Sequence, residues 1–240
     1  MSLSTIAPLT RVELVRQAIL RHIFNGDLNP GDRLVEATLA KQLGVAQATV
    51  NSALQDLHSQ GVVTKVLNRA TRVSRYGQAE IEAMFMVRMI LEPAVAEAAA
   101  AHIGTLGVDE LQSCFEQMRD AAEAVDLPRF CLADYGFHQE LYRLSCNRFL
   151  IQACQAIAAA PFAYILCDCH EPLPTDYVRL AYDHQEIINV LKTGPQPAAE
   201  FMRQKITLWR GWSMRALERQ TSRAGGTNPT GNSESLTSGS

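Results

Sequence analysis

A carboxylate and an imidazole stand four positions apart at Asp134 and His138, so they project from the same face of one helix. Side chains at this spacing can share a divalent metal ion, of the Zn²⁺ or Ni²⁺ kind, or a water that binds an anion. Arg88 precedes Glu92 by the same four positions. A guanidinium that faces a helical interior is suited to bind a carboxylate ligand through two hydrogen bonds, and an internal salt bridge with Glu92 explains the spacing at least as well.

Other reactive side chains indicate no enzyme reaction. The sequence lacks a nucleophile elbow, a phosphate-binding loop, an HExxH helix and paired CxxC motifs. Its six cysteines all lie between residues 114 and 169, mostly within apolar helical patterns, so they are expected to be small core residues without disulfides. Cys167, Cys169 and His170 form a short cluster that lacks the second ligand pair of a typical zinc site.

The charge of the chain is divided between a basic first third and an acidic remainder. Residues 1–76 contain nine Lys or Arg against five Asp or Glu, and the other residues contain thirteen against twenty. A basic segment joined to an acidic one is typical of a phosphate-binding module attached to a domain with another task. No apolar run reaches the ~18 residues needed to span a bilayer, and the N-terminus lacks the order of a secretory signal, so we expect a cytoplasmic protein that does not contact membranes.

Residues 1–76 predict a winged helix-turn-helix domain. The expected elements are helices at 9–25, 34–43 and 47–59 and a hairpin of two β-prone runs at 62–67 and 71–74. Val50, Leu54 and Leu57 are expected to face inward from the third helix. Its opposite face is therefore free to enter the major groove of DNA.

Residues 77–220 predict only amphipathic helices, separated by prolines and glycines. The expected spans are 78–102, 108–125, 127–145, 148–169, 175–193 and 197–220, with Asn147 as a cap between two of them. Together they predict an antiparallel all-helical bundle, so the fold class is mostly α. Residues 221–240 consist largely of Ser, Gly, Thr and Asn, and we expect them to be disordered because they cannot bury enough apolar surface.

Two sets of motifs resemble a known family. The stretch IFNGDLNPGDRLVE at 23–36, followed by Leu39-Ala40 and LGV at 43–45, closely resembles the DNA-binding domain of the GntR family. The motifs Arg88-x3-Glu92, Asp134-x3-His138, Ser145-Cys146-Asn147 and Asp183-His184 resemble the FCD-type, FadR-like effector domain of that family. The resemblance implies a homodimeric transcription regulator that binds a palindromic DNA operator, with an affinity that changes when a small organic acid binds the helical domain.

The third helix is expected to contact base edges, while the segments around it contact phosphates. The base-contacting candidates are Gln47, Thr49, Asn51 and Ser52, and the phosphate-contacting candidates are Arg33, Lys65, Arg69, Arg72 and Arg75. Relatives typically carry SRTPVRE where this chain has AQATVNS at 46–52, so two arginines and an N-cap serine are missing, and loss of the cap costs about 1 kcal/mol. Asn and Gln pair with adenine whereas Arg contacts guanine, so we expect an operator richer in A·T.

In the helical domain, the resemblance adds His184 to Asp134 and His138 as a metal ligand. The expected fourth position falls on Ile206, which cannot coordinate a metal. A three-ligand site remains, completed by Cys131 or by a carboxylate of the ligand, and it is expected to bind metal more weakly. The ligand-binding candidates are therefore Arg88, Asp134, His138 and His184, whereas Trp209, Trp212 and Phe201 are assigned to core packing or the dimer face.

Two other functions stay open at this point. A helical metal-dependent hydrolase could use Asp134, His138 and His184, and stoichiometric metal together with turnover would identify it. A DNA-silent interaction protein could result from the changed third helix, and dimerisation without salt-dependent DNA binding would identify that.

Overall fold

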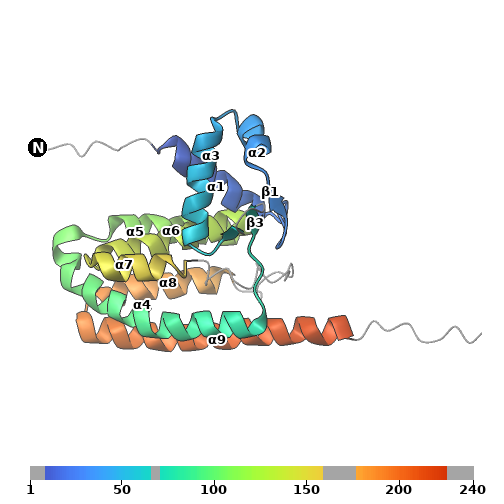
Figure 1. The fold of residues 1–240 in the computed structure, drawn as a ribbon. Coiled ribbons are helices and arrows are strands. Elements are labelled where there is room, and N and C mark those ends of the chain that lie inside the picture. Colours follow the sequence, from blue (N-terminus) through green and yellow to red (C-terminus); the bar gives the residue numbers. More distant parts are fainter. Residues whose placement is uncertain (1–8, 66–70, 159–176, 226–240) are drawn as a thin grey trace, which may run out of the picture.

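The computed structural model describes residues 9–65, 71–158 and 177–225. These residues form a mostly helical protein, as predicted, in which a small N-terminal domain lies on a larger helical body (Figure 1). Within the described ranges, no helix is both long enough and apolar enough to cross a membrane.

The N-terminal domain is a winged helix-turn-helix, as predicted. Its helices are α1 (Arg11–Phe24), α2 (Glu36–Leu43) and α3 (Gln47–Ser59). α3 has the predicted bounds, and its predicted inward side chains Val50, Leu54 and Leu57 are fully buried. Because these residues recur about once per turn, they pack one side of α3 against α1 and leave the other side exposed.

Three short strands form the wing. They are β1 (Arg33–Leu34), β2 (Val63–Lys65) and β3 (Thr71–Val73), in one antiparallel sheet with β3 in the middle. β2 and β3 are the predicted hairpin, but β1 corrects the prediction that Leu34 begins a helix, since Leu34 pairs with Thr71 and α2 begins at Glu36. A two-residue strand is too short to show a period of two, so the sequence could not separate it from the helix that follows.

Within the described residues, six helices build the larger body. They are α4 (Gln78–Leu106), α5 (Asp109–Glu123), α6 (Leu127–Leu144), α7 (Arg148–Gln155), α8 (Tyr177–Leu191) and α9 (Pro195–Gly225). The long helices α4 and α9 lie side by side along the body (Figure 1). Asn147 caps α7 as predicted, because its Oδ1 accepts hydrogen bonds from the N–H groups of Phe149 and Leu150 at 3.0 and 3.3 Å.

The largest differences from the predicted helix bounds are at the ends of α7 and α9, and α4 ends at Leu106 instead of residue 102. α7 ends at Gln155 instead of continuing toward residue 169, because Ile157 and Ala158 make turn hydrogen bonds to residues three positions back. α9 continues to Gly225, so residues 221–225 are helical and not disordered, which is consistent with the low cost of extending a helix that already exists. Arg69, Cys167, Cys169, His170 and the tail 226–240 lie outside the described residues.

A buried polar contact joins the two parts of the molecule. The hydroxyl of Tyr135 on α6 donates a hydrogen bond to Oε1 of Gln60 at 2.6 Å, and it accepts one from Arg16 on α1. Gln60 directly follows α3, and both Tyr135 and Gln60 are buried. The winged domain is therefore anchored to α6 at the residue next to Asp134.

Candidate functional site

The open side of α3 carries the predicted base-contacting residues. Gln47 and Ser52 are exposed, and Thr49 and Asn51 are half-buried. α3 starts without a side-chain cap, as expected from the missing serine. The hydroxyl of Ser52 donates to the carbonyl of Ala48 at 3.1 Å, so that hydrogen is already used inside the helix. Gln47 and Asn51 carry the two amides of this set, and an amide can both donate to and accept from a base edge.

Both amides share one acceptor on α2. Oε1 of Glu36 accepts a hydrogen bond from Nδ2 of Asn51 at 2.6 Å, and Oε2 accepts one from Nε2 of Gln47 at 3.2 Å. Glu36 was not among the predicted site residues. Its partners lie 11 and 15 positions away, and only the packing of α2 against α3 brings the three together.

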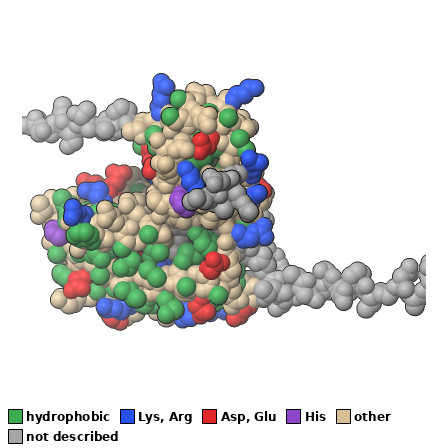
Figure 2. Space-filling view, viewed as in Figure 1, with side chains coloured by type: hydrophobic (Ala, Val, Ile, Leu, Met, Phe, Trp, Pro, Cys, Tyr) green, Lys and Arg blue, Asp and Glu red, His purple; other side chains and the backbone are tan. Residues whose placement is uncertain are grey.

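Basic side chains border α3 on the wing. Arg33 and Arg72 are exposed and stand opposite each other on β1 and β3. Nη1 of Arg72 donates to the carbonyl of Gly31 at 2.7 Å, Arg75 donates to the carbonyl of Pro30 at 2.9 Å, and half-buried Lys65 ends β2. Figure 2 shows Lys and Arg side chains around the edges of the upper domain. Because directly opposed like charges repel each other, the Arg33–Arg72 pair suits a surface that an anion covers.

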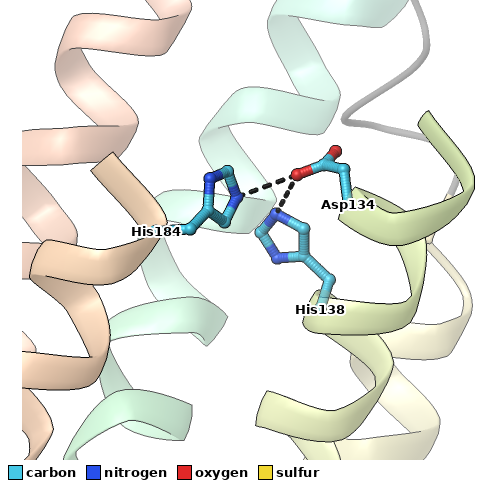
Figure 3. A group of neighbouring side chains, drawn as sticks. All are labelled: Asp134, His138 and His184. Carbon is cyan, nitrogen blue, oxygen red and sulfur yellow. Dashed lines mark ion pairs between the residues drawn. The ribbon is translucent and has the colours of Figure 1, made fainter. Parts of the chain in front are cut away.

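In the helical body, Asp134 and His138 of α6 face His184 of α8 (Figure 3). Oδ1 of Asp134 lies 2.8 Å from Nε2 of His184 and 3.8 Å from Nε2 of His138. All three residues are buried, and their candidate ligand atoms lie within 4.8 Å of one another. The fold thus brings together the three residues that the sequence assigned to one site.

The histidine nitrogens that lie nearest Asp134 fit a divalent metal ion. Nδ1 of His184 donates to the carbonyl of Leu180 at 2.8 Å, which leaves the lone pair of the neutral ring on Nε2. Nε2 of His184 therefore has no hydrogen to donate to Oδ1 of Asp134 at 2.8 Å, so two acceptor atoms face each other, and a cation between them would satisfy both. Ligand atoms about 2 Å from one ion lie roughly 3–3.5 Å apart, and the two measured separations from Asp134 bracket that range.

The electrostatic surroundings favour the protonation states that bind metal. Burial opposes the charge of Asp134, but His184, His138 and Arg88 together outweigh burial and hold the pKa of Asp134 below its ordinary value. Burial lowers the pKa of His138 despite the carboxylates of Asp134 and Glu92 nearby. At neutral pH the cluster therefore offers a carboxylate and a neutral imidazole, the forms required for coordination.

Among the described residues, no fourth protein ligand joins these three. Ile206 on α9 is fully buried and has no atom that can coordinate. Cys131 is outside the cluster, and burial raises the pKa of its thiol well above the ordinary value. The sequence predicts that either Cys131 or a carboxylate of the ligand completes the site. Because Cys131 lies outside the cluster, only the ligand carboxylate is consistent with this arrangement.

Arg88 makes the internal salt bridge with Glu92. Its Nε and Nη2 donate to the two carboxylate oxygens at 2.7 and 3.1 Å, and both side chains are buried. The hydroxyl of Tyr142 donates to the same carboxylate at 3.3 Å. The guanidinium of Arg88 is therefore already engaged by a carboxylate of its own helix.

Trp209 forms one wall of the cluster. Its ring stacks on His184 with centroids 5.6 Å apart and an interplanar angle of 18°, and its Nε1 donates to Asp183 at 3.3 Å. Asp183 also accepts a hydrogen bond from Lys205 at 2.6 Å. Of the two roles predicted for Trp209, core packing is confirmed by its burial, and the same ring also contacts a residue of the candidate site. The period of α9 shows which side of the helix is buried, but not that α8 places a histidine there.

Two family models match the chain. Residues 11–73 match the model described as bacterial regulatory proteins, gntR family, and residues 83–207, more than half of the chain, match that of the FCD domain. The chain belongs to the GntR family, with a C-terminal FCD domain.

Relatives of this GntR-family protein are transcription regulators. The "Probable D-xylose utilization operon transcriptional repressor" of Paenarthrobacter nicotinovorans is 28% identical over 200 residues, which cover 82% of this chain and 87% of the relative. The HTH-type transcriptional regulator McbR of Escherichia coli is 28% identical over 127 residues, which cover 52% of this chain and 58% of McbR. The solved structure of E. coli McbR/YncC shares the fold, with a TM-score of 0.68 at 20% identity over 89% of this chain and 100% of that one. This GntR-family protein is thus a transcription regulator, and none of these names supports the hydrolase alternative.

Proposed function

We propose that this GntR-family regulator binds a palindromic DNA operator as a homodimer, and that a small carboxylate bound with a divalent metal in the FCD domain changes its affinity for DNA. The exposed polar side of α3, bordered by the Arg33–Arg72 pair, is the observation that supports DNA binding most directly. Phosphate groups would relieve the repulsion between these two arginines and fix the position of the helix on the duplex.

An apolar surface on α4 supports the homodimer. Met86 and Ile90 are 63% and 72% exposed, Val87 is 38% exposed, and Ala83 lies one turn before them, so the four form a continuous stripe that we call the α4 stripe. Figure 2 shows hydrophobic side chains gathered on the face of the lower body where α4 runs in Figure 1. Exposed apolar patches of this kind mark protein interfaces. A second copy on this face would give the two α3 helices that a palindrome requires.

The cluster of Asp134, His138 and His184 supports the metal and the carboxylate. Three protein ligands leave coordination positions free for an oxygen of an organic acid. The buried charge of Arg88 is neutralised by Glu92, so a bound cation would not face an unpaired positive charge. A ligand that prefers one arrangement of the dimer would alter the spacing of the two α3 helices, and hence the fit to two half-sites.

The DNA-binding proposal is tested by measuring the affinity of the purified chain for the region upstream of its own gene at several salt concentrations. We expect binding that weakens as salt rises. The double variant Arg33→Ala/Arg72→Ala should reduce the slope of log affinity against log salt by about four, because each of the two protomers loses two phosphate contacts. Arg203→Ala, which removes an exposed charge from α9, is the matched control. Absent binding at low salt, or salt-independent binding, would support the DNA-silent alternative instead.

The effector proposal is tested by thermal unfolding with Zn²⁺ and a panel of small carboxylic acids. Because binding to the folded state raises the melting temperature, we expect Zn²⁺ to raise it, and an active acid to raise it further only when Zn²⁺ is present. His184→Ala should abolish both shifts, whereas His102→Ala, at an exposed position of α4, should keep them. An acid that stabilises His184→Ala as strongly as the unchanged chain would contradict a metal-bound carboxylate.

A further inference from the structure

The carboxylate of Glu36 determines how both amides of α3 are oriented. Glu36 is the first residue of α2, and each of its oxygens accepts one hydrogen bond, from Asn51 at 2.6 Å and from Gln47 at 3.2 Å. A carboxylate can only accept hydrogen bonds, so each amide must turn its NH₂ group toward Glu36. Turning either amide over would point its carbonyl oxygen at a negative charge.

An amide held in this orientation offers DNA a defined pattern of hydrogen-bond donor and acceptor. One N–H of each NH₂ group is used by Glu36, and the second N–H and the carbonyl oxygen remain as a donor and an acceptor side by side. Adenine presents an acceptor, N7, beside a donor, N6–H, in the major groove, which complements this pair. Guanine presents two acceptors there, N7 and O6, and one of them would meet the carbonyl oxygen of the amide.

We propose that Glu36 is a specificity-determining residue of the DNA interface: it locks Gln47 and Asn51 in the orientation that accepts adenine and rejects guanine at two different base pairs. The inference rests on the proposed DNA-binding function. Gln47 and Asn51 lie one turn apart on the same face of α3, so each amide contacts its own base pair. Glu36 itself acts through these amides and contacts no base.

The test compares base preferences, because a merely structural role of Glu36 would lower affinity without changing them. The full-length chain and its variants each select duplexes from a pool in which the half-site is randomised. The unchanged chain should enrich adenine at two positions of the half-site. Glu36→Gln keeps the shape but can donate as well as accept, so the adenine-over-guanine preference at both positions should fall by about five-fold or more.

Three further variants complete the experiment. Asn51→Ala and Gln47→Ala should each remove the preference at one of the two positions, which assigns an amide to each base. Asp56→Asn removes a charge of the same sign from an exposed position of α3 without touching either amide, so it should keep the preferences. If the unchanged chain selects no duplex, the proposed function fails and this inference fails with it. If the unchanged chain selects adenine and Glu36→Gln selects it equally well, or if Asn51→Ala and Gln47→Ala leave the selected sequence unchanged, the role of Glu36 alone is overturned.

Discussion

Arg88 and Glu92 form an ion pair whose two side chains are 2% and 0% exposed, so each charge depends on the other for compensation. The charge of Glu92 and its hydrogen bonds outweigh the burial of Arg88 and raise the pKa of the guanidinium. Burial equally opposes the charge of Glu92, but Arg88 outweighs it and lowers the pKa of that carboxyl. Removal of one partner therefore leaves a buried charge without compensation, whereas removal of both leaves no buried charge.

We expect Glu92→Ala to lower the free energy of unfolding by about 3–5 kcal/mol, because Arg88 would be left buried without a counter-charge. The double variant Arg88→Met/Glu92→Leu replaces both charges by apolar groups of similar volume and should lose much less. Denaturant unfolding of both variants measures the difference. Equal losses of unfolding free energy in the two variants would contradict this explanation, because they would show that the uncompensated charge of Arg88 is not what destabilises Glu92→Ala. A double variant that keeps its response to metal and acid would show that Arg88 is not needed to bind the ligand.

The lowered pKa of His138 predicts how stability depends on pH. Its pKa is below the ordinary value of 6.5 because of burial, so the unfolded chain takes up a proton at a pH where the folded chain does not. The contribution of His138 to stability is therefore present above about pH 6.5 and is lost as pH falls below it. The pKa of Asp134 is lowered as well. Its contribution to stability is lost only at more acidic pH, as the pH falls from 3.8 through the pKa that Asp134 has in the folded chain.

Unfolding measured with a chelator present, from pH 8 to pH 5, tests this prediction. The chain should lose stability below about pH 6.5, and His138→Gln, which cannot take up the proton, should lose less over the same range. His102→Gln on the exposed part of α4 should follow the unchanged chain. A steeper loss in His138→Gln than in the unchanged chain would reverse the sign and disprove the assignment.

At the scale of the elements, Tyr135 is the residue through which α6 meets the winged domain. Tyr135→Phe removes a hydroxyl that bonds to Gln60 and Arg16, and it leaves the buried Oε1 of Gln60 without its donor. We expect the contact between domains to weaken by about 1 kcal/mol, so that backbone amides at the end of α3 exchange hydrogen faster. Tyr182→Phe, at a half-exposed tyrosine of α8, is the matched control. Unchanged exchange at α3 in Tyr135→Phe would show that apolar packing alone holds the domains together.

An element can be predicted from the sequence when the residues that define it are close together in the chain. α3 was predicted with its observed bounds because its buried residues repeat with the helical period and glycine follows. β1 was missed because its pairing with β3 spans nearly forty positions and its two residues show no period. The cluster of Asp134, His138 and His184 could be assembled from the family resemblance. The contacts of Glu36 with the two amides and of Trp209 with His184 could not be predicted. These contacts depend on which helix packs against which, and that information is absent from either helix alone.

At the scale of the whole molecule, a palindrome can be bound by two α3 helices only if the bodies of two chains associate. The α4 stripe is the exposed apolar surface that best suits this association, so Ile90→Asp/Met86→Asp should convert a dimer into monomers in sedimentation equilibrium. Because a monomer contacts one half-site, the variant should lose affinity for the palindrome and keep its weak affinity for a single half-site. Val125→Asp adds a charge at another exposed apolar residue, 78% exposed between α5 and α6, and should remain dimeric. A monomeric unchanged chain, or a double variant that remains dimeric on the palindrome, would require the two chains to meet through another surface.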